Sequence, residues 1–354
     1  MIDMEYVHNQ ANEEGLLSWY ADSRAAMIGV SLRGKSHTAH DMPMQDYHCL
    51  RVLPNGWLLA VVCDGVGSEE HSDIGSSIAA ESFADYTVKY WGAFLDEASI
   101  LNLLKCAALY ATGKISRESG DSGNPVRQYS TTLHAAVYAN GVVYYFHSGD
   151  GGIIAMLEDG TYSLLTKPQK GEDGESVVPL MAGPKAWQVG TADSGVQSIL
   201  LCTDGVYDKI AGTVLRECGL GLDRASAAFF ISPWAADPSE TPKESAELFR
   251  RVFRESQPND FYPRIAKAVA QGNEDGDPLQ FVADYVFRKN RPLTSLQGIQ
   301  DDITVAVIRN TARYPELQPM EYYKGPDWEA INQRVYRQLY ETKQAGVEEC
   351  DTQE

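Results

Sequence analysis

Aspartates at the ends of hydrophobic segments are the residues of this sequence best suited to chemistry. Asp64 directly follows the apolar residues 57–63, and Asp204 follows the apolar residues 199–202 after one threonine, Thr203. Such an uninterrupted run is typical of a strand buried on both faces. Asp46, Asp150 and Asp301 also stand beside predicted strands. Because a charge at the rim of a core is costly unless it is paired or binds a cation, these positions indicate cation binding.

The candidate ligands of such a cation all carry oxygen, and none lies in a histidine-rich segment. Magnesium and manganese favour carboxylates, carbonyls and water, whereas zinc favours histidine or cysteine. Two such ions about 4 Å apart share a carboxylate and hold a bridging hydroxide in line with a phosphoryl group. The aspartates therefore predict hydrolysis of a phosphate ester by two Mn²⁺ or Mg²⁺ ions, without a covalent intermediate.

The composition argues against several other classes of protein. The 354-residue chain has a formal net charge of −19, and this charge would repel the phosphates of a nucleic acid. No segment approaches the length of a membrane span, and the first residues lack the apolar region of a signal peptide. The six cysteines show no C-x-x-C spacing and are expected to be reduced. We therefore expect a cytoplasmic monomer that contacts neither nucleic acid nor membrane.

The first aspartates are expected to be held by two strands and two helices. A strand over residues 25–32 leads into a turn at residues 34–37, and residues 47–53 are predicted to pair with the strand before Asp64. Helices are predicted from Ser72 or Asp73 onward and over residues 97–115, followed by a surface loop over residues 116–128. The inner face of the first helix is predicted to carry Ile74, Ile78, Phe83 and Tyr86.

Two hairpins follow, and they suggest the fold class. Asn140-Gly141 and Asp159-Gly160 each separate two short apolar segments, which is a strong signal for a tight turn. The hairpins are expected to form a meander of antiparallel strands. Helices followed by consecutive hairpins favour an α+β fold, a four-layer α-β-β-α sandwich of two antiparallel sheets flanked by helices.

The remaining segments suggest one large domain with extensions at both ends. We expect an irregular lead-in over residues 1–24, a catalytic domain over residues 25–310 and a helical insertion over about residues 211–291. The tail, residues 311–354, is predicted to hold an amphipathic helix over about residues 327–345, packed on the domain itself.

Six short motifs occur in a fixed order and identify a family. This ordered set resembles the metal-dependent protein serine/threonine phosphatases, the PPM or type 2C family, over roughly residues 25–310. The bacterial branch is the most similar, because a Gly-x-Ser-His segment at residues 34–37 precedes the first motif. The motifs are Gln45-Asp46, Asp64-Gly65-Val66-Gly67, Ser130-Thr131-Thr132, Ser148-Gly149-Asp150, Thr203-Asp204-Gly205 and Asp301-Asp302-Ile303-Thr304.

The resemblance implies roles for the principal ligands. Asp64 would bridge two metal ions, and the carbonyl group of Gly65 would bind one of them. Asp204 and Asp301 would hold the other. Asp302 stands where asparagine is common in the family, and it is the second candidate for the metal-binding role given to Asp301.

Two further aspartates occupy metal positions that vary more within the family. Asp46 lies on the side of the metal ion bound by Gly65, although many members have glutamate one residue earlier, where this chain has Gln45. Asp150 matches an aspartate that some members use for a third, loosely bound ion. The usual Gly-Asp-Ser-Arg continuation is Gly-Asp-Gly-Gly here, at residues 149–152.

The groups that bind the phosphate differ from those of the animal enzymes. Asp41 and Val66 replace the arginine and the histidine that those enzymes use. Lys35 and His37 are the candidates for phosphate binding and for protonation of the leaving group, and a metal-bound water is the other candidate proton donor. His71 and His147 are expected to be structural. Thr131 and Thr132 are expected to pack or hydrogen-bond within the sheet.

The resemblance implies a phosphoprotein phosphatase that hydrolyses phosphoserine and phosphothreonine in a signalling pathway, opposite a serine/threonine kinase. Two alternatives remain open. The missing arginine and the altered segment at residues 149–152 also suit a pseudophosphatase that binds phosphoproteins without turnover. A small-molecule phosphohydrolase, with its selectivity in residues 211–291, would need the same metal ligands.

Overall fold

The computed structural model describes residues 7–231, apart from residues 14, 93, 94, 173–175, 194, 213, 214 and 217. It also describes residues 243, 299–313, 315, 316, 318, 319, 322, 326, 327, 330 and 331. Most of the predicted insertion and of the predicted tail helix lie outside these residues.

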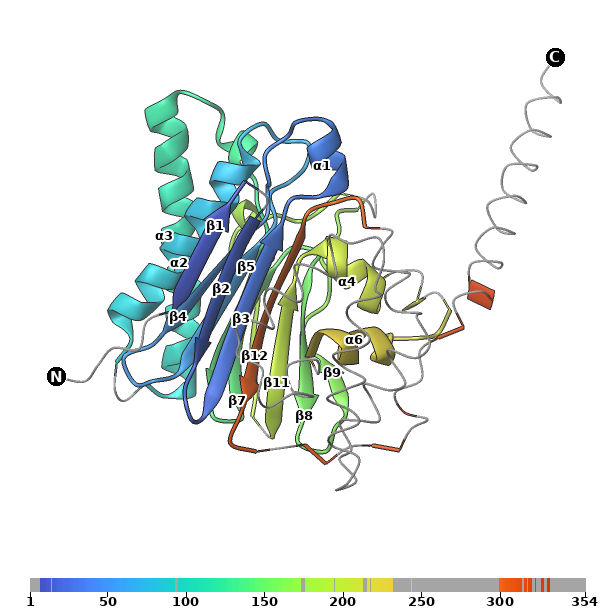
Figure 1. Cartoon of the computed structure of the whole chain (residues 1–354). Helices are drawn as coiled ribbons and strands as arrows, with labels where there is room; N and C mark the ends of the chain where they lie inside the picture. The colour runs from blue at the N-terminus through green and yellow to red at the C-terminus, as the bar shows by residue number, and fades with distance from the viewer. Residues whose placement is uncertain are drawn as a thin grey trace, which may run out of the picture.

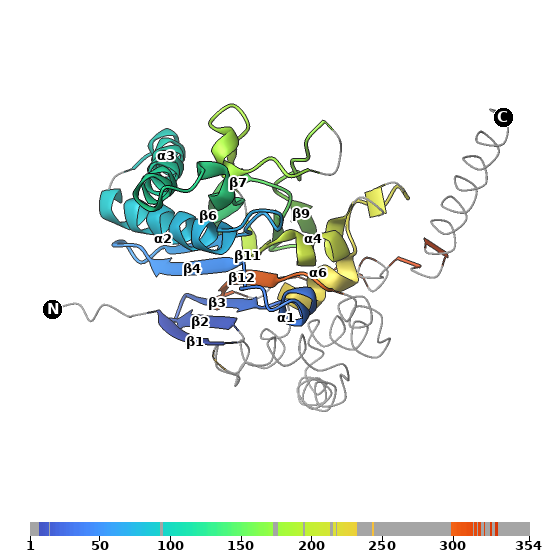
Figure 2. The ribbon, with the colours of Figure 1, turned by 90° about the horizontal axis from the view of Figure 1, so that it is seen from above.

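The described strands form two antiparallel sheets that pack face to face (Figures 1 and 2). The order in the seven-stranded sheet is β1 (His8–Asn12), β2 (Gly15–Ala21), β3 (Ala25–Leu32), β12 (Ile303–Asn310), β11 (Val196–Cys202), β8 (Gly152–Leu157) and β9 (Tyr162–Leu164). The order in the five-stranded sheet is β10 (Gln188–Ala192), β7 (Val142–Ser148), β6 (Leu133–Ala139), β5 (Leu58–Cys63) and β4 (Tyr47–Val52).

Helices lie on the outer faces of both sheets. The long helices α2 (Ser72–Tyr90) and α3 (Glu97–Ser122) cover the five-stranded sheet, as Figure 2 shows. On the other side, α4 (Asp204–Ala211) and α6 (Arg224–Ile231) contact β11 and β12. The short helix α1 (Lys35–Ala39) and the 3-10 helices η1 (Val126–Tyr129) and η2 (Leu180–Ala182) lie in the connections. This arrangement confirms the predicted α+β sandwich of two antiparallel sheets flanked by helices.

The strand β5 shows how alternation builds two cores at once. Leu58, Ala60 and Val62 belong to the core between the two sheets. Leu59 and Val61 belong to the core between the five-stranded sheet and its helices. Successive side chains of a strand point to opposite faces, so a strand covered on both sides needs an unbroken apolar sequence. Burial of each large aliphatic side chain contributes about 1.5–3 kcal/mol to stability.

The two predicted hairpins exist, but they do not form one meander. Asn140 and Gly141 both have positive φ angles, 53° and 102°, as the tight turn between β6 and β7 requires. The strands β7 and β8 belong to different sheets, because the segment between them crosses from one sheet to the other. Gly149 in this crossing has a φ of 122°, a conformation that favours glycine.

Three local expectations were wrong. Within the expected irregular lead-in, residues 8–12 and 15–21 form β1 and β2, which extend the edge of the seven-stranded sheet beyond β3. The helix α3 continues to Ser122, so part of the predicted loop over residues 116–128 is helical. Ile74 is 37% exposed, because α2 turns a face of small residues toward the core instead. A side chain at Gly75 would lie 2.1 Å from the carbonyl oxygen of Tyr129, so a small residue is needed at this contact.

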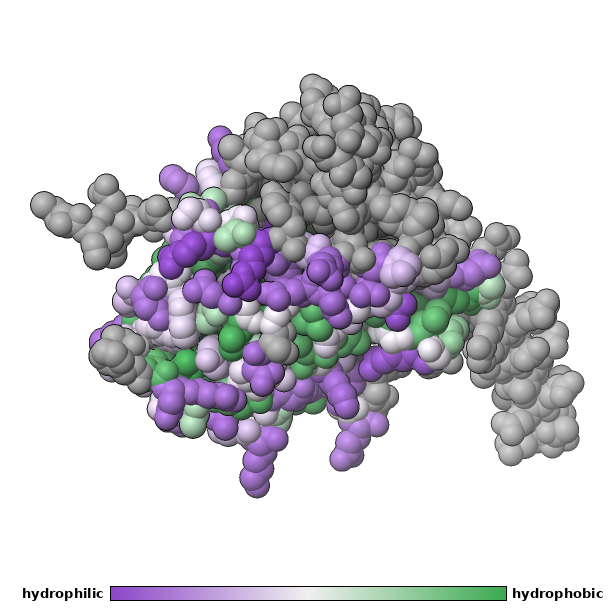
Figure 3. Space-filling model, turned by 90° about the horizontal axis from the view of Figure 1, so that it is seen from below, coloured by the Kyte–Doolittle hydropathy of each residue, from purple (hydrophilic) through white to green (hydrophobic). Residues whose placement is uncertain are grey.

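No helix among the described residues is long and apolar enough to cross a membrane. The five described cysteines are free, in agreement with the prediction, and Cys350 lies outside the described residues. Figure 3 views the underside of the molecule, where hydrophilic and hydrophobic residues are mixed over the described surface.

Candidate active site

Strand register brings the predicted site segments to one end of the sandwich. Tyr47 of β4 pairs with Cys63 of β5, so the residues before β4 and after β5 are neighbours. In the other sheet, Cys202 at the end of β11 pairs with Val305 near the start of β12 and with Gly152 at the start of β8. The connections that carry Asp46, Asp64, Asp150, Asp204 and Asp301 therefore all lie at this end, which Figure 2 shows from above.

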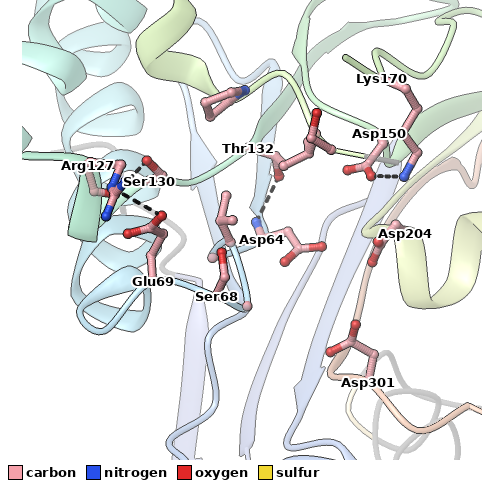
Figure 4. A pocket seen from close by; sticks show the side chains of 16 residues that line it. Asp64, Ser68, Glu69, Arg127, Ser130, Thr132, Asp150, Lys170, Asp204 and Asp301 are labelled. Carbon is pink, nitrogen blue, oxygen red and sulfur yellow. Dashed lines mark hydrogen bonds and ion pairs between the residues drawn. The ribbon is translucent and has the colours of Figure 1, made fainter. Parts of the chain in front are cut away.

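These connections surround a pocket of about 480 Å³. Asp64 enters it from the five-stranded sheet, Asp204 and Asp301 enter it from the seven-stranded sheet, and Asp150 comes from the crossing between the sheets. Figure 4 shows the carboxylates of Asp64, Asp204 and Asp301 around one open space. The carbonyl-bearing Gly65 also lines the pocket. Four of the five predicted metal-binding aspartates thus line the pocket, whereas Asp46 does not line it but lies close enough to act on Asp64 through its charge.

Thr131 and Thr132 fix the backbone of Asp64 by hydrogen bonds. Its N–H donates to Oγ1 of Thr132 at 3.0 Å. Its carbonyl oxygen accepts from the N–H of Thr132 at 2.8 Å and from Oγ1 of Thr131 at 2.9 Å. The next residue has no room for a side chain, because a Cβ at Gly65 would lie 2.6 Å from the carbonyl oxygen of Ser72. The Asp-Gly pair therefore holds its carboxylate and carbonyl groups in a fixed relation.

Asp204 is held by the first turn of α4. The helix begins at Asp204 itself, where the unpaired N–H groups and the helix dipole favour a negative charge. A Cβ at Gly205 would lie 2.5 Å from the carbonyl oxygen of Asp302, so this turn packs directly against the segment that carries Asp301. Burial, and secondly the charge of Asp150, raise the pKa of Asp204 to about 6.

The pocket carboxylates repel each other. Burial raises the pKa of Asp64 well above its usual range, and the charges of Asp46, Asp204 and Asp301 raise it further. Nearby negative charges stabilise the protonated form of each carboxyl group, and a bound cation would reverse this effect. The described residues therefore form a site that favours binding of positive charge.

Asp46 and Asp302 lie behind the pocket. Asp46 is 3% exposed, and its Oδ2 accepts a hydrogen bond from Oγ1 of Thr203 at 2.8 Å. Asp302 accepts from the backbone N–H groups of Gly34 and Gln45, both at 2.6 Å. Burial, and secondly the charge of Asp302, raise the pKa of Asp46 well above its usual range. Since Asp301 lines the pocket and Asp302 is used to hold the backbone, Asp302 is no substitute for Asp301 in this structure.

Lys35 and His37, the sequence candidates for phosphate binding, do not line the pocket. His37 is buried between two carboxylates, with Nε2 lying 3.7 Å from Oδ1 of Asp301. Its Nδ1 lies 3.0 Å from Oδ1 of Asp302, at an angle unsuited to a hydrogen bond. His37 therefore contacts the predicted ligand Asp301 rather than the space in front of it.

Two basic residues of the pocket were missed by the sequence analysis. Lys170 forms an ion pair with Asp150, and Arg127 places Nε 3.6 Å from Oε1 of Glu69. Figure 4 shows these two pairs on opposite sides of the pocket. Neither residue belongs to a recognised motif, and both lie in segments that read as loops. The sequence offered only weak signals for them. Arg127 is a positive charge close to the Ser130 motif, and Lys170 is a positive charge in the segment after β9.

The histidines expected to be structural are engaged by other side chains. The rings of His134 and His147 are fully buried, with their Nδ1 atoms 2.8 Å apart, and burial lowers the pKa of His147 to about 4. The ring of His71 packs on Tyr129 with centroids 5.2 Å apart, and its Nε2 lies 2.9 Å from Nδ2 of Asn124. None of the three lines the pocket.

Comparison with known proteins decides the family. A sequence model of the protein phosphatase 2C family matches residues 33–249. The chain belongs to the protein phosphatase 2C family. The family predicted from the six motifs is confirmed, and as a 2C phosphatase the chain is classed as a hydrolase that acts on phosphoproteins. The matched residues contain Asp46, Asp64, Asp150 and Asp204, whereas Asp301 lies beyond them.

Solved phosphatases are similar to this 2C phosphatase over most of its length. The catalytic domain of the serine/threonine protein phosphatase PstP, solved with two manganese ions, is 16% identical, with a TM-score of 0.48 and coverage of 81% of this chain and 98% of that chain. The serine/threonine phosphatase of S. agalactiae is 15% identical, with a TM-score of 0.48 and coverage of 80% and 99%. PppA of Pseudomonas aeruginosa, a regulatory component of T6SS, is 17% identical, with a TM-score of 0.46 and coverage of 81% and 97%. No curated protein matches the chain in the sequence comparison.

Proposed function

We propose that this 2C phosphatase is a divalent-metal-dependent protein phosphatase that hydrolyses phosphoserine and phosphothreonine. One observation supports it above the others: Asp64, Asp204 and Asp301, from distant parts of the sequence and from both sheets, line one pocket. Burial, and secondly repulsion by the neighbouring carboxylates, raise the pKa of Asp64, as expected for a site that is completed by positive charge.

The donor atoms of the pocket fit a hydrated hard cation. They are carboxylate oxygens and the carbonyl oxygen of Gly65, the donors that Mg²⁺ and Mn²⁺ favour. Among the described residues, no three histidine, cysteine, aspartate or glutamate side chains lie close enough together to hold a metal ion. A cation bound in this pocket would therefore be held by one or two carboxylates and would keep several waters. When bound, such cations supply the charge that activates water and stabilises the reacting phosphoryl group.

The residues around the pocket would have different roles in holding the cations. Asp64 and Gly65 would hold cations from the five-stranded sheet, and Asp204 and Asp301 from the seven-stranded sheet. Asp46 would act from behind, by accepting the hydrogen bond of Thr203 next to Asp204. In this arrangement, packing of the two sheets sets the distance across the site.

Phosphate binding would fall to a residue at the rim of the pocket. Among the described residues that line it, Lys170 and Arg127 carry positive side chains. The side chain of Arg127 is 81% exposed, so it is available to a substrate. Lys35 and His37 would act indirectly, His37 by contact with Asp301. The substrate would be a phosphoprotein modified by a serine/threonine kinase.

The pseudophosphatase alternative also has an observation in its favour. Asp41 stands where the animal enzymes have their phosphate-binding arginine, and its Oδ1 lies 3.4 Å from Nη2 of Arg33. Val66, in place of the family histidine, lines the pocket without a proton to donate. A small-molecule phosphohydrolase remains the other alternative, and the predicted insertion that would select its substrate lies largely outside the described residues.

Turnover of an aryl phosphate with added manganese tests the proposal. We expect the wild-type protein to hydrolyse it and Asp64→Asn to reduce kcat/KM by about 100- to 1000-fold, because removal of one electrostatically stabilising group has effects of this size. A folded wild type that stays inactive would favour the pseudophosphatase. Faster turnover of small phosphate metabolites than of phosphoserine and phosphothreonine peptides would favour the small-molecule alternative.

A further inference from the structure

Asp150, the expected ligand of a third metal ion, already has a cationic partner. Its side chain is only 6% exposed, and its Oδ2 is in contact with Nζ of Lys170. The lysine side chain is 30% exposed and lines the same pocket as Asp64 and Asp204. A positive charge of the protein itself therefore occupies the side of the pocket where a third cation was expected.

The backbone around Lys170 fixes its position. The neighbouring Gln169 donates its N–H to the carbonyl oxygen of Gly149 at 2.8 Å, and its Oε1 accepts from the N–H of Gly149 at 3.0 Å. Lys170 itself forms an antiparallel bridge with Val177. Because Gly149 immediately precedes Asp150, these bonds hold the lysine and the aspartate opposite each other. The ion pair is thus built into the fold rather than formed by two free surface side chains.

Lys170 faces more than one carboxylate. Burial disfavours its charged form, but the hydrogen bond and charge of Asp150, with the charges of Asp204 and Asp208, outweigh this effect and raise the pKa of Lys170. The charge of Lys170 in turn counteracts the rise in the pKa of Asp208 that burial and Asp150 cause. The ammonium group neutralises this side of the site, as a bound cation would.

We propose that the ammonium group of Lys170 takes the place of a third metal ion at Asp150. Divalent cations would then bind only on the side of Asp64, Asp204 and Asp301. The proposal rests on the metal-dependent function above, and it adds that the charge at Asp150 does not depend on the concentration of free metal. A divalent ion entering at Asp150 would have to break a partly buried ion pair and lie next to an ammonium group, and both effects oppose its binding.

The number of bound manganese ions tests this inference. Calorimetric titration, with Mn²⁺ electron paramagnetic resonance as a second readout, is carried out on the wild type and on Lys170→Met. We expect the variant to bind one more manganese ion than the wild type, because Asp150 is released. In the double variant Lys170→Met/Asp150→Asn the number should return to that of the wild type.

Matched variants separate charge from a general disturbance. Lys170→Arg keeps the positive charge and should bind as many ions as the wild type. Lys185→Met removes an exposed lysine from the same connection, outside the pocket, and should also leave the number unchanged. If Lys170→Met does not fold, as judged by circular dichroism, Lys170→Gln supplies the neutral variant.

Two results would overturn the inference. One is an equal number of manganese ions in the wild type and the folded neutral variant. The other is loss of an ion from the wild type on Asp150→Asn alone, because the wild type would then already bind a metal ion there. A wild type that binds no manganese and hydrolyses no phosphate ester would instead end the proposed function. The difference in the number of bound manganese ions between the wild type and Lys170→Met tests the role of Lys170 independently of the enzymatic activity.

Discussion

At the scale of single residues, Asp64 depends on hydrogen bonds that its own side chain does not make. Both of its backbone polar groups are bound by Thr131 and Thr132, which follow η1 and precede β6. A buried N–H group without a partner is costly, so the threonine hydroxyl group fixes both the position and the stability of this turn. The carboxylate is therefore free to face the pocket.

Thr132→Val removes the hydroxyl group and keeps the shape of the side chain. Thr132 is 2% exposed, so the N–H of Asp64 would lose its acceptor without replacement by solvent. We expect a loss of about 1–3 kcal/mol in the free energy of unfolding, measured by urea denaturation, and weaker manganese binding. Thr132→Ser keeps the acceptor and serves as the control. Equal stability of the valine variant and the wild type would show that this hydrogen bond contributes nothing.

The sequence was sufficient to find the central acids and insufficient to find their basic neighbours. Asp64 and Asp204 end apolar runs, and this local pattern already implies a charge at the rim of a core. Lys170 has no such pattern, because it meets Asp150 only through the pairing of Gln169 with Gly149 across the connection. The hydrogen bond between Asp46 and Thr203 was equally hidden in the sequence, because it joins residues far apart in the chain.

At the scale of secondary structure, close backbone contacts align the elements around the site. A side chain at Gly34 would lie 2.4 Å from the carbonyl carbon of Asp301, and one at Gly205 would lie 2.5 Å from the carbonyl oxygen of Asp302. The connection after β3 and the start of α4 therefore pack tightly against the backbone of Asp301–Asp302 from two sides. Glycine at both positions lets three separate segments approach closely.

Gly205→Ala tests this contact. Alanine is a better helix former than glycine, so only the collision with Asp302 opposes the substitution. We expect a loss of about 1–3 kcal/mol in stability and weaker manganese binding, measured by thermal melts and calorimetry. Gly113→Ala in α3, where nothing lies within 4 Å of the new Cβ, should instead stabilise the protein by about 1 kcal/mol. A stabilised Gly205→Ala variant would contradict the packing argument.

The strands were easier to predict than the helix faces and the sheet in which each hairpin lies. An uninterrupted apolar run such as β5 predicts a strand buried on both faces of a sandwich, and this prediction does not depend on which strands lie beside it. The inner face of α2 consists of Gly75, Ser76, Ala79, Ala80 and Ala84 around Phe83, because the helix lies close to η1 and the sheet. Hydrophobicity alone predicted that Ile74 would lie on this inner face. A hydrophobic pattern does not show that the helix must approach its neighbours closely and therefore needs small residues there. The change of sheet between β7 and β8 also leaves no mark in the hydrophobic pattern.

At the scale of the whole molecule, the site lowers the stability of the metal-free protein near neutral pH. Folding raises the pKa of Asp204 from 3.8 to about 6, and it raises the pKa of Asp64 and Asp46 as well. Between these values the folded protein holds more protons than the unfolded chain. The contribution of these three groups to the free energy of unfolding therefore falls as pH rises through this interval.

Thermal melts across this interval measure the effect. With chelator present, we expect the Tm of the wild type to fall as pH rises from about 4 to about 7. Manganese should raise the Tm more at the upper end, because cations bind the deprotonated carboxylates. Asp204→Asn should weaken both dependences. A chelated wild type whose Tm climbs with pH over this interval would contradict the raised pKa of these aspartates.

The position of β12 has a consequence for the way the enzyme is made. This strand lies between β3 and β11, although its first residue, Ile303, is about a hundred residues later in the chain than the end of β11 at Cys202. A ribosome therefore releases all the other described strands before the one that fills the middle of the larger sheet and brings Asp301 with it. Under the proposed function, in which Asp301 binds a metal ion, the nascent polypeptide completes the set of pocket carboxylates only with that late insertion.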